Sequence, residues 1–101
     1  MVRVRVEARA KRLFAQAFPW LGWPEGWRVV WADALPGAFG ICRWNDRLIE
    51  ICRDGAAQQG LDHLDDTLLH ELVHMIHGPA LPHGRAFSAR VRWAKRRAGV
   101  L

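Results

Sequence analysis

The chain has 101 residues, which suits one small domain and excludes two of ordinary size, so we expect a single domain over residues 1–101. Hydrophobic residues make up 50% of the chain, which excludes a disordered polypeptide and predicts a packed core. No apolar run approaches the length of a membrane span, and the first residues do not resemble a signal peptide. With only two cysteines, we expect a reduced, cytoplasmic protein that does not enter a membrane.

The net charge of +5 is distributed unevenly along the chain. Six basic residues and no acidic residue lie between Pro79 and Leu101. The first twelve residues also contain more basic than acidic residues. Cationic ends suit contact with phosphate or with an acidic partner, although a solvated basic surface explains them equally well. The residues through which we expect possible nucleic-acid contact are Arg85, Arg90, Arg92, Lys95, Arg96 and Arg97.

The first predicted element is a helix over about Val4–Phe18, where apolar residues recur at three- and four-residue spacings. Pro19 ends it, and a connection rich in glycine and proline follows. Three tryptophans in this region, Trp20, Trp23 and Trp27, suit either a platform for a substrate or nucleobase, or packing against the core. We prefer the packing interpretation, because a domain this small needs large apolar side chains for its core.

Three strands are predicted next, over Arg28–Ala32, Ala38–Trp44 and Arg47–Cys52. Asn45 and Asp46 form a two-residue hairpin signal between the second and third strands. We expect these strands to form a three-stranded antiparallel sheet.

The hairpin register follows from a loop at residues 45–46. Cys42 should face Ile49, and Phe39 should face Cys52. The two cysteines then point to opposite faces of the sheet and should not form a disulfide with each other. We interpret both as small apolar residues.

Two further helices complete the predicted order. Residues 53–60 read as a loop, and Asp62 as the N-cap of a helix over about His63–His77, which Gly78 and Pro79 end. A last helix over about Arg85–Ala98 has an apolar stripe and a basic outer face. The predicted fold class is therefore α+β.

The first of these helices carries the pattern HExxH at residues 70–74. The spacing places His70 and His74 one turn apart on the same face, where both can reach one zinc ion. Glu71 lies between them, in position to act as general base on a zinc-bound water. The pattern alone also occurs by chance in amphipathic helices, so the context must decide.

A catalytic zinc usually has three protein ligands and one open position. No aspartate or glutamate occurs after Glu71, which excludes a downstream carboxylate and leaves His77 and His83. His77 lies about 10 Å along the helix axis from His70, too far for a short zinc–nitrogen bond without strain. We prefer His83, because the helix break before it can return the chain to the metal. His77 or Arg85 would then be the candidate donor to an oxyanion.

Four segments in this order, 38–42, 48–51, 67–74 and 83–87, resemble the SprT-like zinc metallopeptidases, which include the Spartan-type proteases of DNA–protein crosslinks. The resemblance covers roughly residues 38–98, and HExxH followed by HGxxF is its most specific part. It implies a zincin-like fold with an HExxH active-site helix. It also implies His70, His74 and His83 as zinc ligands and Glu71 as catalytic base. Many relatives continue into a zinc ribbon or DNA-binding tail. Two cysteines are too few for a ribbon, so a minimal catalytic core is expected.

The predicted function is zinc-dependent hydrolysis of peptide bonds in a protein or peptide, and the basic ends suit action near DNA. One alternative is a non-enzymatic, zinc-stabilised basic module that binds nucleic acid. Another keeps metal-dependent hydrolysis but acts on a nucleotide or phosphoester. Glu71 favours an enzyme, because a purely structural zinc site does not need that residue.

Overall fold

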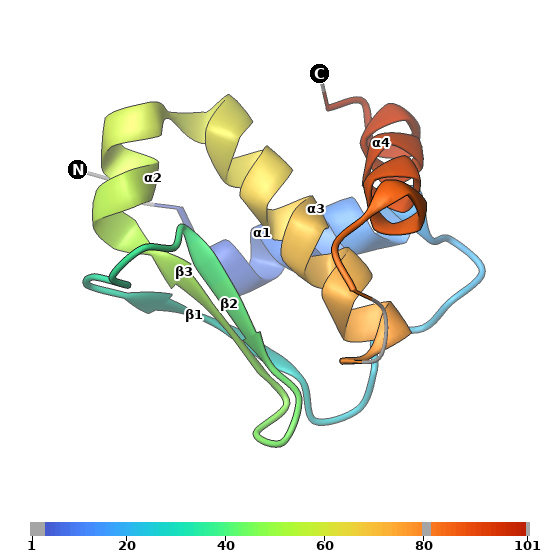
Figure 1. The fold of residues 1–101 in the computed structure, drawn as a ribbon, viewed down its shortest axis with the longest axis horizontal. Helices are drawn as coiled ribbons and strands as arrows, with labels where there is room; N and C mark the ends of the chain where they lie inside the picture. The colour runs from blue at the N-terminus through green and yellow to red at the C-terminus, as the bar shows by residue number, and fades with distance from the viewer. Residues whose placement is uncertain (1–3, 80–81, 101) are drawn as a thin grey trace.

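A computed structural model describes residues 4–79 and 82–100 (Figure 1). It has an α+β fold with four helices and three strands in these residues. In chain order the elements are α1 (Val6–Ala17), β1 (Arg28–Ala32), β2 (Gly40–Arg43), β3 (Leu48–Cys52), α2 (Arg53–Gln59), α3 (Leu61–His77) and α4 (Arg85–Ala98). β1 and α4 have the predicted bounds, whereas α1 is a few residues shorter than the predicted helix over Val4–Phe18. No helix in the described ranges is both long and apolar enough to cross a membrane.

The sheet is mixed, so the prediction of an antiparallel sheet is wrong for one of its two pairings. The strand order is β1-β3-β2, with β3 in the centre. β1 runs parallel to β3, with Arg28 opposite Leu48 and Ala32 opposite Cys52. The chain therefore passes from β1 to β2 at the opposite edge before it returns through the centre. Parallel pairing needs such a long connection, which here contains β2 itself.

The β2–β3 hairpin agrees with its predicted register. The two strands are antiparallel, and Cys42 lies opposite Ile49. The backbone N–H of Cys52 donates to the carbonyl of Phe39 over 2.8 Å, which extends the same register. Both cysteines are buried and free, as predicted.

Residues 53–60 were predicted as a loop, but most of them form α2. The backbone N–H of Gly55 donates to Sγ of Cys52 over 3.4 Å and so caps the helix start. A Cβ at Gly55 would lie only 2.6 Å from the ring of Phe39. Glycine is therefore needed here for close packing, whereas in the sequence it suggests a break.

The helix α3 starts at Leu61, two residues before the predicted start, and Gly60 replaces Asp62 as its N-cap. Gly60 has φ of 89°, a conformation that glycine adopts readily. Asp65, in the second turn of α3, pairs with Arg9 of α1, with Nε and Oδ1 2.5 Å apart. This ion pair joins the first helix to the N-terminal part of α3.

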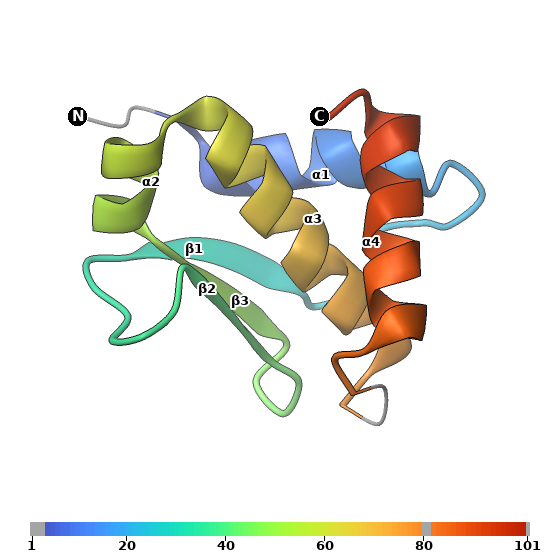
Figure 2. The same cartoon turned by 45° about the horizontal axis from the view of Figure 1, so that its top comes forward.

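α3 is the central helix and packs against α1, α4 and the sheet (Figures 1 and 2). Its inward residues are almost completely buried and form the middle of the core: Leu64, Leu68, Leu69, Leu72 and Val73. From α1, Glu7 accepts a 2.8 Å hydrogen bond from the backbone N–H of Val29 in the edge strand β1. The sheet and α4 both pack against α3, which therefore sets their relative positions.

Candidate metal centre

The HExxH residues all lie on α3. His70 and His74 are one turn apart, and their ring centroids are 4.9 Å from each other. Both are half-buried, and Phe87 of α4 packs against both rings. The local spacing thus places two imidazoles side by side, as predicted.

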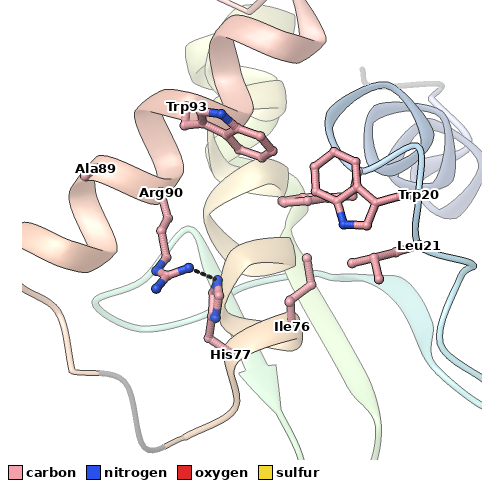
Figure 3. A pocket seen from close by; sticks show the side chains of 8 residues that line it. Trp20, Leu21, Ile76, His77, Ala89, Arg90 and Trp93 are labelled. Atoms are coloured by element: carbon pink, nitrogen blue, oxygen red, sulfur yellow. Dashed lines mark hydrogen bonds between the residues drawn. The ribbon is translucent and has the colours of Figure 1, made fainter.

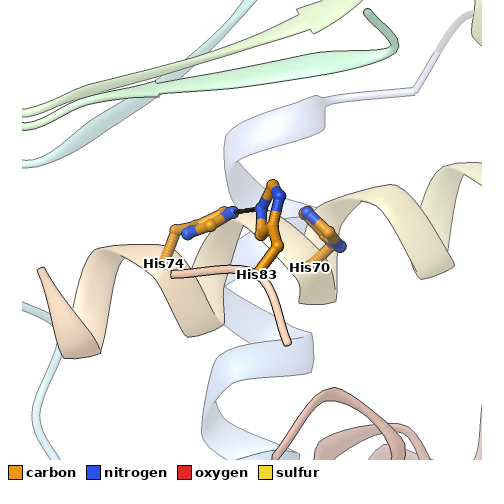
Figure 4. Close-up of side chains that lie close together, drawn as sticks. All are labelled: His70, His74 and His83. Atoms are coloured by element: carbon orange, nitrogen blue, oxygen red, sulfur yellow. Dashed lines mark hydrogen bonds between the residues drawn. The ribbon is translucent and has the colours of Figure 1, made fainter. Parts of the chain in front are cut away.

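His83 joins these two residues from the chain that returns toward α4 (Figure 4). Its Nε2 lies 2.6 Å from Nε2 of His74, and ligand atoms of the three histidines lie within 4.8 Å of one another. The return begins at Gly78, which has φ of 71° and ends α3. Three imidazole nitrogens therefore converge on one point from two separate segments.

His77 does not belong to this cluster. Its Nε2 lies 3.4 Å from Nη1 of Arg90, and the residue lines a different pocket. Between the two candidates for a third ligand, the structure brings His83 to the HExxH histidines. The assignment of these three residues as zinc ligands stays a prediction.

Phe87, in the first turn of α4, packs against all three imidazoles. Its ring stacks on His74 with centroids 4.2 Å apart and 30° between the planes. The centroid distances to His70 and His83 are 4.8 Å and 4.9 Å. Phe87 is only 2% exposed, so it forms an apolar floor that fixes the rings relative to one another.

Trp44, at the end of β2, holds the hairpin to the last turn of α3. Its Nε1 donates to the backbone carbonyl of His74 over 3.0 Å. Its ring also meets the His74 imidazole edge to face, with centroids 5.8 Å apart. The β2–β3 hairpin is therefore connected to α3 at His74, which is itself a member of the histidine cluster.

Glu71 points toward the sheet and is 5% exposed. A Cβ at Gly40 of β2 would lie 3.1 Å from Cγ and 3.2 Å from Oε2 of Glu71. Glycine therefore lets the edge strand approach the carboxyl group closely. Burial raises the pKa of Glu71 to about 7.

Burial has the opposite effect on the neighbouring imidazoles, because their charged form is the cation. It lowers the pKa of His74 to about 4, helped by the nearby His70 and His83. The pKa of His70 is also lowered, first by burial and then by His83. Both rings are therefore neutral near pH 7, with lone pairs free to bind a metal.

The donor set fits zinc, which is commonly bound by three neutral imidazoles. Nδ1 of His74 is buried and, within the described residues, has no hydrogen-bond partner. Nε2 of the same ring faces Nε2 of His83 over 2.6 Å, so Nε2 is the atom through which His74 would bind a metal.

A cavity of about 300 Å³ opens beside Glu71, between the edge strand and α3. His70, Glu71 and Phe39 are among its lining residues. His63 also lines it and contacts the Phe39 ring at 4.5 Å between centroids. The candidate centre thus has an adjoining space large enough for a side chain.

One of the comparisons with known proteins found a match. A sequence profile of the SprT-like family matches residues 6–100. The chain belongs to the SprT-like family. The match covers nearly the whole chain and extends beyond the resemblance over residues 38–98 to include α1 and β1. No match was found among curated proteins or among solved structures.

Sequence reasoning missed three contributors to this SprT-like site. Gly40 was grouped with a family motif, but a glycine inside a strand also signals close backbone approach. Phe87 was assigned to the apolar stripe of its helix, without contact to the histidines. Trp44 gave no signal, because its bond to α3 joins residues 30 positions apart.

Proposed function

We propose that this chain is a zinc-dependent metallopeptidase. His70, His74 and His83 would hold the zinc ion, and Glu71 would serve as general base. The observation that carries the proposal is the convergence of three imidazoles next to a buried carboxyl group. Membership of the SprT-like family is consistent with this chemistry.

Zinc, when bound, would supply a Lewis acid that polarises the peptide carbonyl and lowers the pKa of water. Glu71 would take the proton from the attacking water and pass it to the leaving amine. The raised pKa of about 7 suits a group that both accepts and returns a proton near neutral pH. Close contact with Gly40 limits the positions that the carboxyl group can take.

The edge strand β2 is the proposed place for the substrate backbone. In the described sheet it pairs on one side only, with β3, so its other edge offers free N–H and C=O groups. An extended peptide adding to this edge would run past Glu71 and the histidines. One of its side chains would enter the cavity lined by Phe39 and His63.

The donor to the oxyanion was expected to be His77 or Arg85. His77 contacts Arg90 and lines a pocket outside the cluster, which argues against it. Arg85 begins α4, two residues after His83. Arg85 is therefore the donor included in this proposal.

The test is cleavage of an unfolded protein substrate by the zinc-loaded chain and by Glu71→Gln. Loss of the base should reduce the rate about 100-fold or more, with zinc content unchanged. Glu25→Gln, at an exposed loop position, is the matched control and should cleave like the wild type. Undiminished cleavage by Glu71→Gln would refute the proposal. Zinc binding without cleavage by the wild type would favour the structural module instead.

A further inference from the structure

A second pocket, of about 450 Å³, lies between the loop after α1, the end of α3 and one face of α4 (Figure 3). We propose that it binds a base of single-stranded nucleic acid. This site goes beyond the proposed peptidase chemistry, because it uses none of the candidate zinc ligands and does not include Glu71.

Two indole rings form the aromatic part of the pocket. Trp20 is 60% exposed, although core packing was the preferred interpretation of this residue from the sequence. Trp93 of α4 is half-buried, and the centroids of the two rings are 5.6 Å apart at 62°. Leu21 and Ile76 complete the apolar lining. An exposed indole face beside an apolar hollow of this volume suits a planar ring that stacks.

The charges around these rings are positive. Arg90 lines the pocket, and the guanidinium of Arg97 lies 5.3 Å from the Trp20 centroid and 5.1 Å from the Trp93 centroid. Nε of Arg97 also donates to the carbonyl of Ala17 over 3.1 Å, which fixes this cation in place. No acidic residue lines the pocket. The ligand should therefore combine a flat ring with negative charge.

The spacing along α4 makes these features one surface. Arg90, Trp93 and Arg97 occupy positions i, i+3 and i+7, which share a helix face. A strand of nucleic acid offers a stackable base and phosphates at regular spacing, so it can use both the rings and the cations. An acidic peptide would use only the cations.

The pocket adjoins the candidate metal centre. His77 lines it and follows His74 by three residues, about 4.5 Å along the helix axis. A strand with a base in the pocket would therefore pass within about one helical turn of the histidine cluster.

The test is the affinity of the chain for a short fluorescent oligothymidylate, followed by anisotropy at several salt concentrations. Trp20→Ala should weaken binding about tenfold, as expected for loss of one stacked base, and Trp20→Phe should restore much of it. Trp20 is mostly exposed, so the fold should persist, which circular dichroism checks.

The charge is tested by a pair of variants on the same helix. Arg90→Ala should weaken binding and reduce the salt dependence by about one ion. Arg92→Ala removes the same charge from a position about 160° around the helix and should have a clearly smaller effect.

An oligonucleotide without bases provides the decisive comparison, because it keeps the phosphates. It should bind at least about tenfold more weakly than oligothymidylate. Equal binding of the two, or equal losses in Arg90→Ala and Arg92→Ala, would overturn the proposal. Glu71→Gln should bind like the wild type, so failure of the peptidase proposal would leave this result separate.

Discussion

The histidine cluster and the tryptophan pocket are neighbours on α3, and α4 helps to build both, yet their physical characters are opposite. At the cluster, Phe87 is buried against the three imidazoles, and burial lowers the pKa of His70 and His74. At the pocket, Trp20 is exposed beside the guanidinium of Arg97. One helix pair can therefore hold a buried site of imidazoles and an open, cationic surface. Substitutions should therefore disturb fold and metal binding at the first, and only surface binding at the second.

The largest expected effect separates the two histidines that compete for the third ligand. His83→Ala should lower zinc affinity about 100-fold or more, because it removes one of three converging nitrogens. His77→Ala, on the pocket side, should still bind about one zinc per chain. Zinc content after dialysis against a weak chelator measures both. Zinc loss in His77→Ala with zinc retained in His83→Ala would assign the third ligand to His77. The cluster and the pocket would then not be separate sites.

Phe87→Ala should have the next largest effect, a loss of about 3–5 kcal/mol in the free energy of unfolding. The ring is 2% exposed, and its removal leaves a cavity under the imidazoles. Trp20→Ala should cost clearly less, about 1 kcal/mol, because the ring is 60% exposed and loses mainly its edge contact with Trp93. Urea unfolding measures the free energy of unfolding of both variants. Equal losses would contradict the difference between the buried and the exposed site.

A smaller effect concerns Glu71 in the metal-free chain. Its pKa is raised from 4.5 to about 7 in the folded state, so folding is favoured while the group is protonated. Stability from this group is complete below pH 4.5 and is lost as the pH rises to 7 and above. Glu71→Gln lacks this loss, and should gain up to about 3 kcal/mol over wild type between pH 5 and pH 8.

Urea unfolding with a chelator present measures that gain at the two pH values. Titration of the histidines is common to both proteins and cancels in the difference. Glu25→Gln, which changes an exposed side chain, should show no comparable gain. A constant difference between Glu71→Gln and wild type at both pH values would show that burial does not control this carboxyl group.

Local signals predicted the parts of the fold in which neighbouring residues interact. The hairpin register followed from two loop residues, and α4 from a periodic stripe. The parallel pairing of β1 was not predictable, because the residues of a strand look alike in either direction. Gly55 misled for a related reason: its role is set by Phe39, which lies just before β2 and packs on it from 16 residues away in the sequence.

In the candidate site, too, some residues were predictable from local sequence and others depend on tertiary contacts. His70, Glu71 and His74 come from one helix, so their spacing alone indicated a shared face. His83 was preferred over His77 by helix geometry and a chain break, and the structure brings it to the cluster. Gly40 and Trp44 act across the boundary between sheet and helix. Their contributions depend on tertiary contacts that no local pattern encodes.

The mixed sheet also has a consequence for the order in which the molecule folds. β1 can pair with β3 only after the chain between them has closed a long loop, which is a slow, entropically costly step. The three histidines lie within residues 70–83, and their meeting needs only one helix and the turn that follows. We therefore expect the histidine cluster to assemble early, as a nucleus of sequence-local contacts, and the parallel edge of the sheet to form last.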